Sequence, residues 1–157
     1  MKNAIITAAA EAFRSSMPVD ASVSAHTRNA RKIASEWKRK CVALVPGIRY
    51  EETVAQDLGQ RIDILDEQDQ CAYELKVSGK NAYAEFYKDI VKVLMWNEAH
   101  EAQSKKIKEF VFMTEETWGK KQLDTDMPKA FIKFLLAKFE LSVKIEYPYK
   151  LDSTRNE

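Results

Sequence analysis

Apolar positions along the chain follow two different spacings, and each spacing predicts one kind of secondary structure. Spacings of three and four residues predict helices over about residues 2–15, 26–45, 81–100 and from Pro128 onward. Alternation of apolar and polar residues predicts strands over about 48–53, 61–66, 71–77 and 141–147. A near-continuous apolar run predicts another strand, covered on both faces, over 107–114. This order predicts an α/β fold with a mixed central sheet flanked by helices.

Length and composition are typical of one globular domain that needs no disulfide bonds. The chain has 157 residues, of which 45% are hydrophobic and 31% are charged, and such a chain can bury a sizeable core. No apolar run approaches the length of a membrane span, so we expect a cytoplasmic protein with no membrane partner. Cys41 and Cys71 lack metal-ligand spacing and are expected to be free thiols. With only two histidines, any metal here would have oxygen ligands.

Charge is distributed unevenly along the chain, although the net charge is only +1. Residues 26–50 carry seven basic side chains and one acidic one, whereas residues 51–78 carry eight acidic and two basic ones. One interpretation is two solvated faces that attract each other. The other is that the basic helix, in particular Arg31 and Lys32, contacts the phosphate backbone of a nucleic acid. The pattern alone leaves both interpretations open.

The most informative stretch is the hairpin that strands 61–66 and 71–77 are predicted to form. If residues 67–70 are the turn and Asp66 pairs with Cys71, Asp63 lies opposite Glu74. Directly opposed side chains of antiparallel strands lie on one face, with Cβ atoms about 5 Å apart. Lys76 falls on the same face, diagonally from Asp63. We therefore expect this face to display the charges, and the core to be covered by Ile62, Ile64, Tyr73, Leu75 and Val77.

Two opposed carboxylates repel each other, and the repulsion raises the pKa of one of them unless a positive charge lies between them. A divalent cation such as Mg²⁺ would supply that charge, with two carboxylates, a backbone carbonyl and waters as its ligands. Alternatively, Lys76 and Arg61 neutralise the acids in an ordinary surface network. The hairpin by itself supports both hypotheses equally.

An Asp in the second strand and a Glu-x-Lys sequence in the third resemble the PD-(D/E)XK phosphodiesterase superfamily, which has the restriction-endonuclease-like fold. The matching residues are Ile62, Asp63, Glu74, Leu75 and Lys76. Ile62 stands where the proline of the motif is expected, a departure that is common in that superfamily. The matching order of elements covers over half the chain. The resemblance implies a single nuclease-like domain with a core over about 26–114, to which helix 2–15 and the helix and strand within 128–147 are additions.

The resemblance implies a role for each residue of this motif. Asp63, Glu74 and the main-chain carbonyl of Leu75 would bind Mg²⁺, for which Mn²⁺ can substitute. Lys76 would orient or deprotonate the attacking water and stabilise the transition state. These roles agree with the chemistry expected of two carboxylates and an amine beside a reacting phosphate.

The family often adds an acid from the first helix or the first strand. Glu36, Glu51 and Glu52 are the candidates here, and we favour Glu52 as the further catalytic residue. If Tyr50 points inward, Glu51 takes its place. The family also tends to place phosphate-contacting groups just after the Glu-x-Lys strand, where this chain has Ser78, Lys80, Tyr83 and Lys88.

The function implied is a Mg²⁺-dependent endonuclease that hydrolyses phosphodiester bonds in nucleic acid, DNA rather than RNA. An RNA-directed nuclease, for example a toxin, fits the same residues. The alternative outside enzymes is a non-catalytic nucleic-acid-binding or protein-interaction module that keeps the fold. No separate DNA-reading motif is recognisable, so specificity would come from loops of the core or from a partner subunit. A homodimer would provide two sites for cutting both strands.

Overall fold

The computed structural model describes residues 1–16, 23–54, 59–101 and 105–150, and in the second helix it describes side chains from residue 29 onward. The helices are α1 (Lys2–Ser16), α2 (Val23–Leu44), the short 3₁₀ helix η1 (Gly79–Asn81), α3 (Ala82–Ala99), α4 (Glu116–Leu123) and α5 (Asp126–Phe139). The strands are β1 (Ile48–Thr53), β2 (Arg61–Asp66), β3 (Cys71–Lys76), β4 (Glu109–Glu115) and β5 (Ser142–Tyr149).

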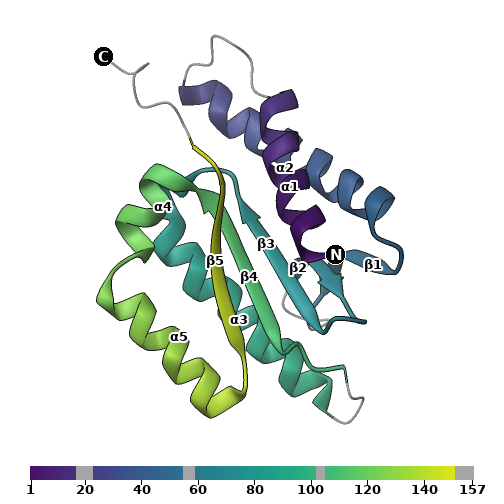
Figure 1. Cartoon of the computed structure of the whole chain (residues 1–157), viewed down its shortest axis with the longest axis vertical. Coiled ribbons are helices and arrows are strands. Elements are labelled where there is room, and N and C mark those ends of the chain that lie inside the picture. Colours follow the sequence, from purple (N-terminus) through teal and green to yellow (C-terminus); the bar gives the residue numbers. More distant parts are fainter. Residues whose placement is uncertain (17–22, 55–58, 102–104, 151–157) are drawn as a thin grey trace.

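The strands form one sheet in the order β1-β2-β3-β4-β5 (Figure 1). β1, β2 and β3 are antiparallel neighbours. β4 is parallel to β3, and β5 is parallel to β4, because a helical connection returns the chain to the same end of the sheet each time. The predicted α/β fold with a mixed sheet and flanking helices is therefore confirmed.

Helices cover both faces of the sheet. α1 and α2 pack on one face, and Figure 1 shows them on the side opposite to α3. The sheet residues buried beneath α1 and α2 include Ile64, Tyr73, Leu75, Val111 and Met113. Those buried against α3 and α5 include Ile62, Leu65, Ala72, Phe110 and Phe112. Successive residues of β4 thus alternate between two hydrophobic clusters, which confirms the prediction that this strand is covered on both faces.

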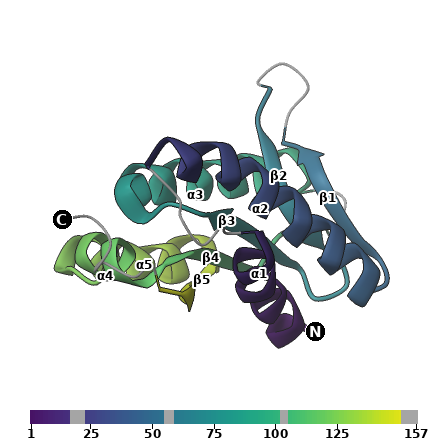
Figure 2. The same ribbon diagram turned by 90° about the horizontal axis from the view of Figure 1, so that it is seen from above.

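The β2–β3 hairpin has the predicted register, in which Asp66 pairs with Cys71 and Ile64 with Tyr73. The expectation that its charged face would be displayed to solvent is wrong. α3 covers that face, and Glu74 is only 1% exposed. Figure 2 shows the outer part of the hairpin sheet, β1 with β2, lying to the side of α2 and away from α4 and α5. Glu74 is therefore enclosed between α3 and the sheet, where it contacts Lys92, whereas Asp63 contacts Lys38 of α2.

α4 was not among the predicted elements. It has only eight residues, and its buried residues are Gly119 and Leu123, so it lacks the apolar stripe by which a helix is predicted from sequence. Its start is fixed instead by Glu115, whose side chain accepts hydrogen bonds from the backbone N–H groups of Thr117 and Trp118. The two cysteines are free and buried as expected, and burial raises the pKa of each thiol to about 12.

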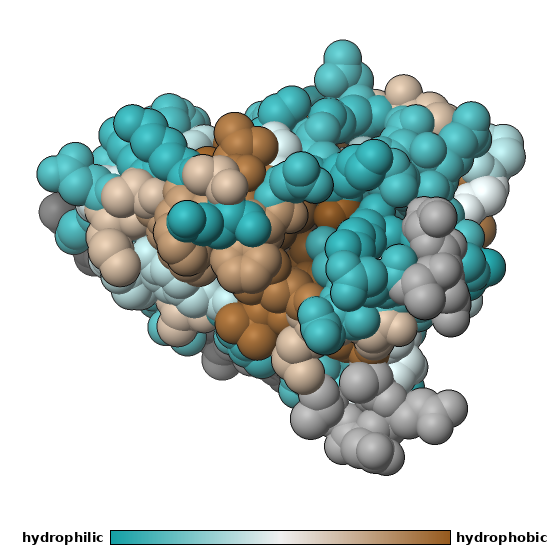
Figure 3. Space-filling view, turned by 90° about the horizontal axis from the view of Figure 1, so that it is seen from below, coloured by the Kyte–Doolittle hydropathy of each residue, from teal (hydrophilic) through white to brown (hydrophobic). Residues whose placement is uncertain are grey.

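Several large apolar side chains remain exposed on the surface. On α5 they are Met127, Phe134, Leu136 and Phe139. Figure 3 shows apolar surface gathered between polar flanks at the lower end of the molecule. None of the helices in the described ranges is both long enough and apolar enough to span a membrane.

Candidate functional site

The site lies where backbone-to-backbone hydrogen bonds between β2 and β3 are replaced by hydrogen bonds from backbone N–H groups to side-chain carboxylates. The paired residues of β2 and β3 end at Ile64 and Tyr73, and the next positions are Asp63 and Glu74. The N–H of Asp63 donates to Oε1 of Glu74 at 3.2 Å, and the N–H of Leu75 donates to Oδ2 of Asp63 at 3.3 Å. The two carboxylates predicted to face each other thus hold the strands together in place of backbone carbonyls.

A third carboxylate stands in the same row, on β1. Tyr50 pairs with Ile64 and Glu52 with Ile62, so the register places Glu51 opposite Asp63. Glu51 has a left-handed backbone with φ of 54°, a conformation that is uncommon for a residue other than glycine and often marks a functional position. Glu51, Asp63 and Glu74 therefore form an acid row across β1, β2 and β3.

Lys38 of α2 joins two members of the acid row. Its Nζ lies 2.9 Å from Oε1 of Glu51 and 2.9 Å from Oδ1 of Asp63. Oε2 of Glu51 accepts from Arg61 at 3.0 Å. Burial alone would raise the pKa of Asp63, but the charge of Lys38 and hydrogen bonds to the carboxylate hold this pKa below its ordinary value. Asp63 is therefore ionised at neutral pH.

Glu74 has a different environment, because α3 encloses it. Its Oε1 accepts from Nζ of Lys92, which also donates to the carbonyl of Arg61 at 2.8 Å. Burial, and then the charges of Asp63 and Asp89, raise the pKa of Glu74 well above its ordinary value. Oε2 of Glu74 is buried and has no hydrogen-bond partner among the described residues. Nζ of Lys76 lies 3.6 Å from this oxygen, an ion pair that is too long for a hydrogen bond.

Lys76 projects toward the same cluster from the end of β3. Its Nζ lies 3.2 Å from Oδ2 of Asp89, 3.4 Å from Oε2 of Glu85 and 3.6 Å from Oε2 of Glu74. Burial alone would lower the pKa of Lys76, but the charges of Glu74, Asp89 and Asp63 raise it above its ordinary value. Lys76 is therefore a cation at neutral pH, and in this state it supplies positive charge rather than a free base.

Sequence analysis missed two residues of this cluster, Asp89 and Lys92. Both are buried, at 0% and 7% exposure, and Lys92 Nζ lies 2.8 Å from Oδ1 of Asp89. The apolar spacing that predicts this helix includes Tyr83 and Val91, but these side chains are 43% and 52% exposed. The buried residues of α3 are Ala82, Phe86, Asp89, Ile90, Lys92, Val93 and Trp96. In the sequence, the sign of this buried ion pair was an Asp and a Lys three residues apart among apolar positions of the helix.

The oxygen donors of the site fit the chemistry of Mg²⁺. Leu75 directs its N–H toward β2, and the geometry of antiparallel pairing directs its carbonyl to the same side. No group of three or more His, Cys, Asp and Glu side chains is placed to hold a metal in the described ranges. An Mg²⁺ ion at this position would have Asp63, Glu74 and the Leu75 carbonyl as protein ligands and waters as the others. Lys38 would have to release Oδ1 of Asp63.

The structure places the other acid candidates as follows. Glu52, which we favoured, lies opposite Ile62, and its ion-pair partner is Arg49 at 3.9 Å. Glu36 pairs with Arg39 on the surface of α2. Glu51 is the acid that shares Lys38 with Asp63, so the alternative to Glu52 is the one that the structure brings to the cluster. The choice of Glu52 depended on strict alternation of side chains along β1. In the structure Glu51, one residue earlier, is the acid that lies beside Asp63.

The predicted substrate-contacting residues lie on two sides of this cluster. Arg31 and Lys32 are exposed on α2. Ser78 begins η1, where its hydroxyl accepts from the N–H of Lys80. Tyr83 and Lys88 are exposed on the first turns of α3, and Lys88 lies 3.9 Å from Glu85, which also approaches Lys76. The exposure of Tyr83 leaves it available to a ligand.

A scan of models of protein families, a search of curated proteins and a search of solved structures each found no match to this chain.

Proposed function

We propose that the chain is a Mg²⁺-dependent nuclease that hydrolyses phosphodiester bonds in nucleic acid, with DNA as the expected substrate. The observation that carries the proposal is the pairing of Asp63 with Glu74 across an interrupted ladder, with Lys76 beside them. Each carboxylate accepts a backbone N–H of the neighbouring strand, and Oε2 of Glu74 has Lys76 at ion-pair distance but no hydrogen bond. These features support a cation site beside the cluster.

Each residue of the cluster would have a different role in hydrolysis. A bound Mg²⁺, or Mn²⁺ in its place, would polarise a phosphate oxygen and lower the pKa of a water. Asp63, Glu74 and the Leu75 carbonyl would hold the ion. The cationic Lys76 would stabilise the negative charge that grows on phosphorus-bound oxygens as the water attacks and one ester bond breaks. The leaving oxygen takes up one proton, and the attacking water gives one up.

Two α3 residues would position these groups without touching substrate. Asp89 contacts both Lys76 and Lys92, and Lys92 in turn contacts Glu74. These buried contacts limit the conformations of Glu74 and Lys76, and a fixed geometry is what lets charged groups stabilise a transition state without reorganising. α3 therefore supports the motif that β3 carries.

The proposal is tested by incubating the protein with supercoiled plasmid, single-stranded DNA and RNA at stepped Mg²⁺ concentrations. We expect cleavage that requires the ion and that is lost in both Asp63→Asn and Glu74→Gln. The Glu74 amide keeps an oxygen that can accept from Lys92 and from the Asp63 N–H, so this variant should remain folded. Circular dichroism checks the fold of each variant.

Glu52→Gln is the matched control, because it removes a carboxylate from the neighbouring strand outside the acid row. It should cleave like the wild type. If all three nucleic acids stay intact at every Mg²⁺ concentration while the protein is folded, the enzyme proposal is wrong and a non-catalytic binding module takes its place. Cleavage of RNA alone would assign the RNA-directed alternative. Sedimentation of the same samples tests the proposed homodimer or partner subunit, and a cytoplasmic location stays a prediction.

A further inference from the structure

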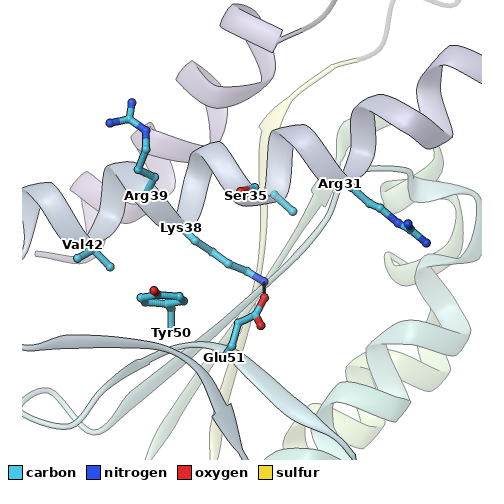
Figure 4. A pocket seen from close by; sticks show the side chains of 8 residues that line it. Arg31, Ser35, Lys38, Arg39, Val42, Tyr50 and Glu51 are labelled. Carbon is cyan, nitrogen blue, oxygen red and sulfur yellow. Dashed lines mark hydrogen bonds and ion pairs between the residues drawn. The ribbon is translucent and has the colours of Figure 1, made fainter.

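A pocket of about 530 Å³ lies between α2 and β1, beside the acid row (Figure 4). This volume is within the range of small-molecule sites. The lining residues come from three turns of α2 and from two neighbouring residues of β1: Arg31, Ala34, Ser35, Lys38, Arg39, Val42, Tyr50 and Glu51. The pocket is distinct from the cluster around Glu74, which lies on the α3 side of the sheet.

One wall of the pocket is aromatic and apolar. Tyr50 is 57% exposed and Val42 is 43% exposed, and Figure 4 shows the Tyr50 ring beneath α2 near Val42. An exposed ring at the wall of a pocket is a surface on which a planar group can stack. Nucleic-acid bases are such groups, and every base has a π-face that an aromatic side chain can use.

The rest of the lining is polar and basic. Arg31 and Lys38 carry positive charge, and Ser35 has a hydroxyl between them on α2. The guanidinium of Arg39 is bound to Glu36 and points away from the pocket in Figure 4. Lys38 is paired with Glu51 and Asp63, so Arg31 is the lining cation that has no acidic partner among the described residues. A cation beside an aromatic ring suits an anionic ligand that also has an aromatic part, such as a nucleotide.

Lys38 connects this pocket to the acid row. It lines the pocket, and its Nζ reaches both Glu51 and Asp63 at 2.9 Å (Figure 4 shows the Glu51 contact). Tyr50 precedes Glu51, the row's outer member, and adjacent Cα atoms are about 3.8 Å apart. A nucleotide in this pocket would therefore lie beside the Lys38 amine that contacts Asp63.

We propose that this pocket binds the base of an unpaired nucleotide next to the scissile phosphate, with Tyr50 as the stacking surface and Arg31 as a contact to a neighbouring phosphate. The inference rests on the proposed nuclease function. It defines the substrate class as single-stranded or locally unpaired nucleic acid. In a duplex the base is already stacked and paired, and extracting it costs a few kcal/mol, so a blunt duplex is expected to bind less tightly.

The test measures binding by fluorescence anisotropy in EDTA, where no cleavage can occur. The probes are a labelled single-stranded DNA, the same sequence as RNA, and the blunt DNA duplex. Stacking on one aromatic side chain contributes about 1–3 kcal/mol per base, so Tyr50→Ala should weaken single-strand binding roughly tenfold or more. Tyr50→Phe should bind like the wild type, because it keeps the ring.

Phe134→Ala is the matched control, since Phe134 is an exposed aromatic residue on α5, outside the pocket. It should leave all affinities unchanged. Equal affinities of Tyr50→Ala and wild type for both single strands, or an equal loss for the blunt duplex, would overturn the inference. The DNA and RNA arms show which single strand the pocket accepts.

Cleavage of the same probes in Mg²⁺ separates this inference from the proposed function. Cleavage that does not depend on Tyr50 and does not favour single strands would leave the nuclease standing and overturn the pocket. Tyr50-dependent binding without any cleavage would support the pocket and overturn the nuclease.

Discussion

Nζ of Lys38 lies 2.9 Å from Oδ1 of Asp63, so an ammonium group from α2 occupies an oxygen that a metal ion at this site would need. Both side chains are largely enclosed, with 15% and 21% exposure. At such a site a lysine and a divalent cation compete for one carboxylate. Lys38 gives Asp63 a countercharge, and binding of the proposed ion would require this side chain to move.

Replacing Lys38 by Met should therefore have opposite effects on the two states. Without Mg²⁺ the variant leaves Asp63 without this partner, and we expect it to lose about 1–3 kcal/mol of stability. With the competing ammonium gone, Mg²⁺ should bind more tightly and raise the melting temperature more than it does in the wild type. Thermal unfolding over a Mg²⁺ titration measures both effects.

Lys40→Met is the control for this prediction, because Lys40 contacts Glu11 on a more exposed part of the same helix. Its cost should be below about 1 kcal/mol, with the wild-type response to Mg²⁺. A Lys38→Met protein whose melting temperature responds to Mg²⁺ no more than that of the wild type would show that Lys38 does not compete for the site.

Lys76 should matter for turnover more than for substrate binding. Lys76→Ala removes the cation that faces the acids at the end of β3, and we expect the cleavage rate to fall by a factor on the order of 10² or more. Lys76→Arg keeps the charge, but its planar guanidinium fits poorly among Glu74, Glu85 and Asp89, so rescue should be incomplete. Single-turnover rates at saturating protein, measured beside affinities, separate the two effects. Full activity of Lys76→Ala would remove Lys76 from the mechanism.

Asp89 is fully buried between two ammonium groups, and its loss should destabilise the protein. Asp89→Asn leaves Lys76 and Lys92 with one negative charge fewer, and removing one partner from a buried ion pair costs about 3–5 kcal/mol. Urea denaturation measures this cost. Glu85→Gln, which alters a half-exposed partner of Lys76, is the comparison and should cost less than about 1 kcal/mol. If the two variants lose similar free energies of unfolding, the burial of Asp89 does not increase its contribution to stability.

The sequence was sufficient to predict the strands and the hairpin register, because their signals are local. Residues 67–70 form a polar turn of fixed length, and once Asp66 pairs with Cys71 the pairs up to Ile64 with Tyr73 follow. Asp63 and Glu74, the next positions, are joined by a hydrogen bond to the Glu74 side chain. The apolar run in β4 likewise showed that helices cover both faces. Short spacings of this kind do not depend on the rest of the chain.

The environment of the motif could not be predicted in the same way. Packing against the sheet decides which face of α3 points inward. Asp89 and Lys92 can be buried on that face because each forms ion pairs, Asp89 with Lys76 and Lys92, and Lys92 with Glu74. The third acid depended on the backbone of Glu51, whose positive φ no spacing rule indicates. Single-sequence patterns describe one element at a time, whereas these features arise between elements.

The exposed cations Arg31 and Lys32 should determine how strongly nucleic-acid binding depends on salt. A cation that neutralises a phosphate releases counterions, so log affinity falls linearly with log salt concentration. Replacing both by alanine should weaken binding to every sequence alike and reduce the slope by about 1 for each charge removed. Anisotropy titrations from low to moderate salt, in EDTA, measure the slope.

The comparison is the double variant Arg39→Ala with Lys40→Ala on the same helix. Those two cations already have acidic partners within the protein, Glu36 and Glu11, so they release few counterions and the slope should stay near the wild-type value. An unchanged slope for the Arg31 and Lys32 variant would leave a solvated helix face as the explanation of the basic run. A changed sedimentation coefficient with an unchanged slope would instead assign these cations to a contact between two copies of the chain. Only a reduced slope at constant sedimentation places the phosphate backbone along α2, on the side of the sheet from which Lys38 reaches Asp63.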